Sequence, residues 1–314
     1  MPTVARIPLA TWPTPLESAP RLAVALGLRP EDLAVKRDDL AGPAGGGNKI
    51  RKLERTCAEA LGAGADVLVT SGAPQSNHAR LTAAAAARLG LGATLVLEGE
   101  APDGDRGNLL LDRLLGADVV WAGPVDAAGL ATAVEDAAGR LQAQGRRPHV
   151  VPFGGSSPVA ARAYVDAATE IEEQWPGLDH LVVALGSGGT MAGLVAGLGA
   201  GRVLGVHTGA VTDPEQTVRG LLAGMGVDAG PLRLRLDQVG VGYAALTEPV
   251  VAAVQLAART EGLVLDPTYT GRALAGLVAA VRDGEVRLGE RVVFLHSGGL
   301  PGLFGHPDAA RLVG

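Results

Sequence analysis

The sequence predicts an α/β protein made of two open, mainly parallel sheets with helices on both faces of each. From about residue 61 onward, short runs of apolar and β-branched residues alternate with alanine-rich helical stretches, which is typical of βαβ units. The chain has 314 residues, of which 47% are hydrophobic, so it is long enough to bury two cores. A Gly-Gly-Ser-Ser-Pro run at Gly154–Pro158 supplies a loop through which the chain can pass between the two units.

The first series of elements comprises predicted strands at 66–70, 94–97 and 119–121 and predicted helices at 79–89 and 109–115. The second series comprises predicted helices at 161–173, 191–198 and 248–261 and predicted strands at 181–185, 203–207 and 292–296. Residues 181–201 carry no charged side chain and by length alone fit a membrane span. The glycine-rich break after residue 185 favours a strand, a tight loop and a helix instead.

The charge distribution gives no sign of a nucleic-acid or membrane partner, because the formal net charge is −6 and no long run of one sign occurs. Cys57 is the only cysteine, so no disulfide can form within the chain. Residues 1–20 contain no apolar segment of signal-peptide length. We therefore expect a cytoplasmic protein that acts on a small soluble substrate.

Lys49 stands where a glycine-rich loop, Gly45–Gly47, runs into a predicted helix that Asn48 can cap. A P-loop would need Gly-Lys-Ser/Thr, whereas Asn48 precedes this lysine and isoleucine follows it, so an ATP site is not indicated. A cation is disfavoured at a helix N-terminus, and the same field helps to lower the pKa of the amine. The pattern favours a nucleophilic lysine that forms a Schiff base. Lys52, three residues on, is expected to project elsewhere.

A second loop, Ser71–His78, follows a predicted strand at the sheet edge where open α/β sheets bind ligands. Ser76, Asn77 and His78 offer a hydroxyl, an amide and an imidazole for a carboxylate or a ring oxygen. Capping of the next helix by Ser76 or Asn77 explains the same residues equally well.

A third loop also lies between a predicted strand and a predicted helix, and its backbone amides and hydroxyls suit a phosphate. It reads Gly186-Ser187-Gly188-Gly189-Thr190. A dinucleotide fingerprint would need glycine where Met191 stands, so a monophosphate fits better than NAD. A plain tight turn is the alternative.

Two of the three tyrosines, Tyr243 and Tyr269, stand in turns marked by glycine or proline. Core packing is the default for any single tyrosine, so these two matter only in combination with the loops above. The six histidines show no metal-ligand spacing, so no metal is expected. No Gly-x-Ser-x-Gly hydrolase elbow occurs either.

Five motifs follow one another along nearly the whole chain: Gly-Gly-Asn-Lys-x-Arg-Lys-Leu-Glu, Gln-Ser-Asn-His-x-Arg, Gly-Ser-Gly-Gly-Thr, Leu-Asp-Pro-x-Tyr-Thr-Gly and a terminal His-Ser-Gly-Gly. Together they resemble the D-cysteine desulfhydrase and 1-aminocyclopropane-1-carboxylate (ACC) deaminase family. The resemblance implies the tryptophan-synthase-β-like fold of type II pyridoxal-phosphate enzymes and a homodimer. It also implies a small domain, residues 51–157, inserted in a large domain of residues 1–50 and 158–314, with the active site in the cleft.

By this resemblance the cofactor is pyridoxal 5′-phosphate, bound as a Schiff base to Lys49. Asn77 would bond the ring hydroxyl and Thr270 the ring nitrogen. The phosphate would lie in the loop formed by Gly186, Ser187, Gly188, Gly189 and Thr190. The implied carboxylate-binding residues are Ser76, Asn77 and His78, and the implied catalytic residues are Lys49, Ser76, Tyr243 and Tyr269.

The implied reaction removes the α-proton of a small amino acid, expels the β-substituent and releases pyruvate and ammonia; with D-cysteine the leaving group is sulfide. ACC deaminase and L-cysteate sulfo-lyase are the alternatives within the family. A non-catalytic phosphate-binding module is an alternative of a different class, and it leaves Lys49 unexplained. By the same resemblance, ACC deaminases have Tyr-Glu at the position where this chain has Tyr269-Thr270. A carboxylate can keep the pyridine nitrogen of the cofactor protonated, whereas threonine can only form a hydrogen bond with it. We therefore predict that pyruvate is released from D-cysteine faster than ACC is deaminated.

Overall fold

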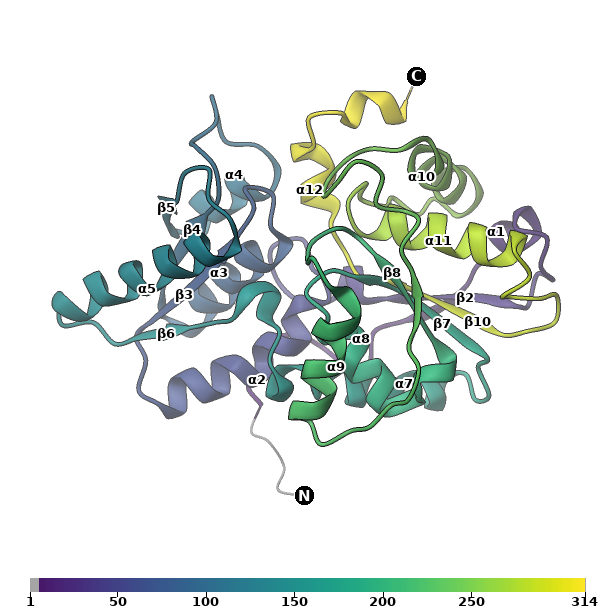
Figure 1. The fold of residues 1–314 in the computed structure, drawn as a ribbon, viewed down its shortest axis with the longest axis horizontal. Helices are drawn as coiled ribbons and strands as arrows, with labels where there is room; N and C mark the ends of the chain where they lie inside the picture. The colour runs from purple at the N-terminus through teal and green to yellow at the C-terminus, as the bar shows by residue number, and fades with distance from the viewer. Residues whose placement is uncertain (1–5, 314) are drawn as a thin grey trace.

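The computed structural model describes residues 6–313 and contains two sheets of mainly parallel strands flanked by helices (Figure 1). The larger sheet has six strands in the order β1-β2-β10-β7-β8-β9, and only the edge strand β1 is antiparallel to its neighbour. Its strands are β1 (Leu16–Ser18), β2 (Leu33–Arg37), β7 (His180–Leu185), β8 (Val203–His207), β9 (Arg233–Arg235) and β10 (Val292–His296).

The smaller sheet has four parallel strands in the order β5-β4-β3-β6. They are β3 (Val67–Gly72), β4 (Gly92–Leu97), β5 (Asp118–Trp121) and β6 (Pro148–Val150). All four lie in the sequence between β2 and β7, so the smaller sheet is inserted in the chain that builds the larger one. The predicted fold class is therefore confirmed. Residues 1–5 and 314, which belong to the predicted large domain, lie outside the described residues.

Helices cover both faces of each sheet. The larger sheet packs against α1, α10 and α11 on one face and against α7, α8 and α9 on the other. The smaller sheet packs against α2, α3 and α4 on one face and against α5 on the other. The helices are α1 (Pro20–Ala25), α2 (Lys49–Gly62), α3 (Asn77–Leu89), α4 (Gly107–Leu114), α5 (Ala127–Ala143), α6 (Pro158–Ala161), α7 (Ala163–Gln174), α8 (Gly189–Leu198), α9 (Pro214–Gly224), α10 (Glu248–Glu261), α11 (Thr270–Arg282) and α12 (Leu300–Gly305).

The apolar run of β10 shows why these strands lack a polar face. Val292 and Phe294 belong to the core under α1, α10 and α11, whereas Val293 and Leu295 belong to the core under α7, α8 and α9. All four side chains are buried, as parallel strands covered on both faces require. Truncating one such side chain, for example Phe294 to alanine, costs about 3 to 5 kcal/mol in comparable cores.

The uncharged stretch 181–201 forms β7, a tight loop and α8, as predicted. Within residues 6–313, no helix combines the length and the apolar character that a membrane crossing requires. The loops that follow β3, β7 and β10 leave the carboxyl ends of their strands, and residues from all three line the same cavity.

Candidate active site

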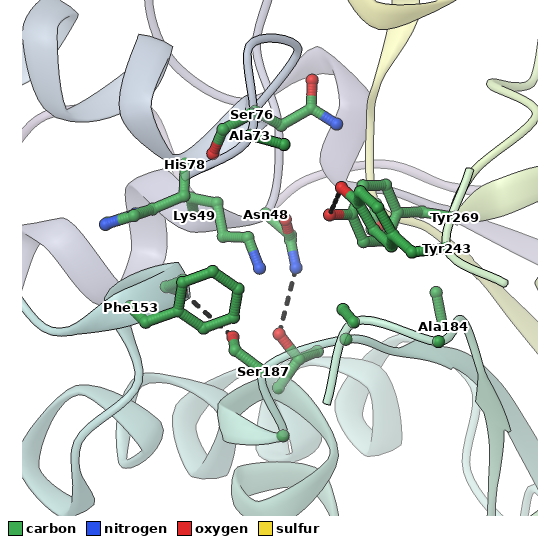
Figure 2. Close-up of a pocket in the computed structure, with 18 of the residues that line it drawn as sticks. Asn48, Lys49, Ala73, Ser76, His78, Phe153, Ala184, Ser187, Tyr243 and Tyr269 are labelled. Carbon is green, nitrogen blue, oxygen red and sulfur yellow. Dashed lines mark hydrogen bonds between the residues drawn. The ribbon is translucent and has the colours of Figure 1, made fainter. Parts of the chain in front are cut away.

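One cavity, of about 220 Å³, is lined by residues from the connecting loops of both sheets. It brings together nearly all of the predicted site residues: Lys49, Ser76, Asn77, His78, Gly186, Ser187, Gly188, Thr190, Tyr243 and Tyr269. In Figure 2 the amine of Lys49 points into the space between Ser76, Phe153 and the tyrosine pair. Gly189 and Thr270 are not among the lining residues.

Lys49 is the first residue of α2 and follows a tightly folded glycine loop. Gly46 has a φ of 66°, and a Cβ there would lie 2.1 Å from the carbonyl oxygen of Asp39, so only glycine fits. Burial lowers the pKa of the Lys49 amine to about 8. A larger fraction of this amine than of an ordinary lysine is therefore in the neutral form that attacks an aldehyde.

Lys52 lies close to Lys49 and does not project away from it, so the sequence prediction for Lys52 was wrong. Its side chain is fully buried, and its Nζ donates to the carbonyl oxygen of Gly154 at 2.5 Å and to Ser156 Oγ at 3.0 Å. Residues three apart lie on the same side of a helix, so Lys52 accompanies Lys49. Burial and the nearby charge of Lys49 hold the pKa of Lys52 well below its usual value.

The loop from Gly186 to Thr190 forms a cradle of donors at the start of α8. Gly188 has a φ of 82°, and the Gly189 N–H donates to Ser156 Oγ at 3.2 Å. A Cβ on Gly189 would lie 2.5 Å from Ser156 Oγ, which explains the glycine there. Ser187 Oγ lies 2.8 Å from Ser156 Oγ. The helix N-terminus, the hydroxyls and the nearby Lys52 together suit a phosphate.

Asn48 does not cap α2, contrary to the sequence prediction, because its side chain makes no capping hydrogen bond. Its Nδ2 donates instead to Thr190 Oγ1 at 3.0 Å, and a dashed line from Asn48 marks this bond in Figure 2. The residue beside Lys49 is thus tied directly to the donor cradle.

Ser76 both lines the cavity and caps α3, since its Oγ accepts the backbone N–H of Ala79 at 3.1 Å. The capping and ligand-binding explanations of this loop are therefore compatible. Asn77 and His78 are the first two residues of α3, and such N–H groups have no acceptor within their helix. Both residues line the same cavity as Ser76, and N–H groups at the start of a helix suit a carboxylate.

The imidazole of His78 is neutral and carries its proton on Nε2. Thr70 Oγ1 donates to the carbonyl oxygen of Val151 at 2.9 Å and therefore accepts from His78 Nε2, also at 2.9 Å. Nδ1 carries the lone pair and has no hydrogen-bond partner within residues 6–313. Burial and the charges of Lys52 and Lys49 hold the pKa of His78 well below its usual value. An anionic substrate group would therefore bind more favourably to the backbone N–H of His78 than to the imidazole ring of His78.

Tyr243 and Tyr269 form a pair on the side of the cavity that belongs to the larger sheet (Figure 2). Their hydroxyl oxygens lie 2.7 Å apart, and their rings meet edge to face at 67°. Burial raises the pKa of Tyr243 to about 12 and that of Tyr269 well above its usual value. Both phenols therefore remain protonated at neutral pH.

Thr270 is fully buried beside Tyr269, and its hydroxyl donates to Asp266 Oδ1 at 2.7 Å. The structure thus gives this hydroxyl a partner in the protein and does not bring it to the cavity. Ser297, at the end of β10, lines the cavity instead and belongs to the terminal His-Ser-Gly-Gly run. Glu98 and Phe153 also line it, and no motif in the sequence pointed to them.

The residues present fit pyridoxal phosphate. A reactive lysine and an anion cradle line one cavity, and the buried Lys52 donates to Ser156 beside the cradle. The cradle is closely packed, since a Cβ on Gly188 would lie 3.0 Å from Thr217 and a Cβ on Gly189 2.5 Å from Ser156. Lys49 would hold the aldehyde carbon, and the cradle and Lys52 would hold the phosphate.

The family model of the pyridoxal-phosphate-dependent enzymes matches residues 7–298. The chain is thus an enzyme of the pyridoxal-phosphate-dependent class. A putative ACC deaminase from Pyrococcus furiosus is 39% identical, with 96% of this chain and 94% of that protein covered. A D-cysteine desulfhydrase from Serratia proteamaculans is 41% identical, with 96% of each covered. The chain belongs to the ACC deaminase and D-cysteine desulfhydrase family.

Solved structures agree with this assignment. The crystal structure of an ACC deaminase homologue superposes with a TM-score of 0.91 at 38% identity and covers 99% of this chain and 97% of its own. Threonine deaminase isoform 2 from Solanum lycopersicum superposes with a TM-score of 0.69 at 19% identity, covering 97% of this chain and 84% of its own. The second likeness concerns the fold alone.

Proposed function

We propose that this enzyme converts a small β-substituted amino acid to pyruvate and ammonia. D-cysteine is the best candidate, and its conversion would also release hydrogen sulfide. The observation that carries the proposal is the placement of the Lys49 amine between a phosphate-type cradle and a pair of protonated tyrosines in one cavity. A module that only binds phosphate would need the cradle but neither Lys49 nor the tyrosines.

Lys49 is the proposed attachment point of the cofactor and the base that accepts the substrate's α-proton at Nζ. Its pKa of about 8 suits both tasks near neutral pH. Pyridoxal phosphate, when bound, supplies an electron sink for the negative charge that develops at the α-carbon. The surrounding residues orient the substrate, and Asn77 is the proposed partner of the cofactor ring hydroxyl.

The substrate carboxylate is proposed to bind the backbone N–H groups of Asn77 and His78 together with the hydroxyl of Ser76. Ser76 is also a candidate acid or base. Tyr243 and Tyr269 share one hydrogen bond, so one of their two phenolic hydrogens is left to donate. That hydrogen would stabilise the departing β-substituent.

ACC deamination is the second candidate, supported by the likeness to putative ACC deaminases. The position of Thr270 still favours D-cysteine, because the chain presents no carboxylate there and the threonine hydroxyl already bonds Asp266. ACC has no α-hydrogen, and the opening of its ring requires the stronger electron sink that a protonated ring nitrogen gives. An L-cysteate sulfo-lyase remains a third candidate.

The test is a screen for 2-oxo acid release, run on the wild type and Lys49→Ala. D-cysteine, L-cysteine, L-cysteate and β-chloro-D-alanine would give pyruvate, and ACC, which has four carbons, would give 2-oxobutanoate. The wild type should prefer D-cysteine or β-chloro-D-alanine, and the variant should lose all turnover. Borohydride reduction followed by peptide fragmentation should place the cofactor on Lys49 and not on Lys52. Full turnover in the variant, or ACC opening as fast as the best elimination, would contradict the proposal.

We also propose the domain boundaries 1–50 with 158–314 for the large domain and 51–157 for the small one, a homodimer and a cytoplasmic location. Strand β6 ends at residue 150 and α6 begins at residue 158, which supports the second boundary. Light scattering of the purified protein gives the mass that decides between one chain and two.

A further inference from the structure

Behind Asn77 lie two fully buried polar side chains that the catalytic scheme does not use, Arg80 on α3 and Asn108 on α4. Arg80 Nε donates to Asn108 Oδ1 at 2.7 Å, and Arg80 Nη2 donates to the carbonyl oxygen of Gly46 at 2.9 Å. Asn108 Nδ2 in turn donates to Asn77 Oδ1 at 2.9 Å and to the carbonyl oxygen of Gln75 at 2.8 Å. A continuous line of hydrogen bonds thus runs from the glycine loop before Lys49 to the cavity wall.

The direction of every bond in this line is set by the arginine. A guanidinium has donors only, so the group of Asn108 that faces Arg80 must be its oxygen. The amide nitrogen of Asn108 must then face Asn77 and Gln75, and it can bond only to their oxygens. Turning the Asn108 amide over would set donor against donor and oxygen against oxygen in a buried site, at a cost of about 1 to 3 kcal/mol for each lost bond.

The orientation of Asn108 determines which atom of the Asn77 amide can face the cavity. Asn77 lines the cavity, and its oxygen is occupied by Asn108, so the group it can present is its amide nitrogen. A nitrogen donor binds an oxygen that carries negative charge and does not bind another donor. The same Arg80 holds the carbonyl oxygens of Ala44 and Gly46, so one guanidinium sets the position of both Asn77 and the loop that leads to Lys49.

The geometry points to Asn108 and Arg80 as positioning residues that lock the side-chain amide of Asn77 as a hydrogen-bond donor toward an anionic oxygen in the cavity. The inference rests on the proposed function, in which that oxygen is the ring oxygen of pyridoxal phosphate. Neither residue lines the cavity, so neither is a catalytic residue.

Asn108→Asp tests this directly, because an aspartate has the same shape and still accepts from Arg80 but cannot donate to Asn77. Asn77 then turns its nitrogen to the aspartate and its oxygen to the cavity. The dissociation constant of pyridoxal phosphate from the apoprotein should rise about 10- to 100-fold, and the visible absorbance maximum of the bound cofactor should shift. Asn77→Ala should give a similar loss, and the double variant should be no worse than Asn77→Ala alone.

Arg88→Gln is the matched control, since Arg88 lies on the same helix and donates to the carbonyl oxygen of Leu9, away from the cavity lining. Its affinity and spectrum should equal those of the wild type. Multiplicative losses in the double variant, or wild-type affinity and spectrum in Asn108→Asp, would overturn the inference. If Asn108→Asp does not fold, Arg80→Lys, which keeps the charge but lacks Nε–H, should shift the spectrum in the same direction, and no shift overturns the inference. A wild type that binds no pyridoxal phosphate overturns the proposed function, and this inference with it.

Discussion

At the scale of single residues, the two lysines of α2, Lys49 and Lys52, are proposed to have different tasks. Lys49 would hold the cofactor, and Lys52 would donate from Nζ to the phosphate, whose negative charge favours the protonated form of this buried amine. Lys52→Gln should therefore weaken the binding of pyridoxal phosphate about 10- to 100-fold, because a charge-assisted hydrogen bond is lost. Binding of pyridoxal, which lacks the phosphate, should stay unchanged. Equilibrium titration of the apoprotein with both compounds measures this, and equal losses for the two would contradict the assignment.

The cavity-lining residues that the sequence predicted are those in short motifs with a recognisable chemistry, such as Lys49 and the loop at Gly186. Lys52 was misplaced because its direction depends on the helical spacing of three residues and on the Gly154 carbonyl, which lies 102 positions away in the chain. Asn108 gave no signal at all, since a lone asparagine acquires its role only through partners on another helix.

At the scale of elements, the start of α11 depends on one carboxylate. Asp266 Oδ2 accepts the backbone N–H groups of Thr268 and Tyr269, and Asp266 Oδ1 accepts the N–H and the hydroxyl of Thr270. Thr270→Glu would place a second carboxylate beside Asp266 in a fully buried position, so it should lower the free energy of unfolding by roughly 3 kcal/mol. It should also fail to create efficient ACC opening.

Urea unfolding and the ACC assay check this expectation. Thr270→Ser is the matched control, because it keeps the hydroxyl that bonds Asp266, and its stability should stay close to that of the wild type. A Thr270→Glu protein of wild-type stability that opens ACC efficiently would refute both the packing argument and the substrate argument built on Thr270.

Long apolar strands were the elements that the sequence predicted best: 203–207 and 292–296 coincide with β8 and β10. α11 was not predicted, because residues 266–271, which lead into its first turn, read Asp-Pro-Thr-Tyr-Thr-Gly, a pattern typical of a turn. The helix starts at that position because Asp266 supplies acceptors that periodicity does not reveal.

At the scale of the whole molecule, the alternation of strands and helices predicted two α/β units but not their nesting. Strand β2 pairs with β10 across more than 250 residues of sequence, and such pairing leaves no local signal. The inserted arrangement followed only from the family resemblance, and the strand orders confirm it.

The pH dependence of global stability offers a last prediction, which concerns Asp112 of α4. Its side chain is fully buried, and both carboxylate oxygens lack a hydrogen-bond partner within residues 6–313. Burial raises the pKa of Asp112 to about 7, above the value of about 3.9 expected in the unfolded chain. The folded state therefore binds this proton more tightly, and the contribution of Asp112 to stability falls as pH rises from about 4 to about 7.

Asp112→Asn removes this titration while keeping the shape of the side chain. The free energy of unfolding of the variant minus that of the wild type should rise with pH by up to about 1.4 kcal/mol per pH unit between about pH 4 and pH 7, and then stay constant. Urea unfolding at several pH values measures the difference, in which all other titrating groups cancel to first order. Leu114→Ala, at an exposed position of the same helix, is the control and should give a difference that does not vary with pH, because it removes no titrating group. A pH-independent difference for Asp112→Asn would mean that the carboxyl group titrates alike in the folded and unfolded chains, and that its burial has no electrostatic cost.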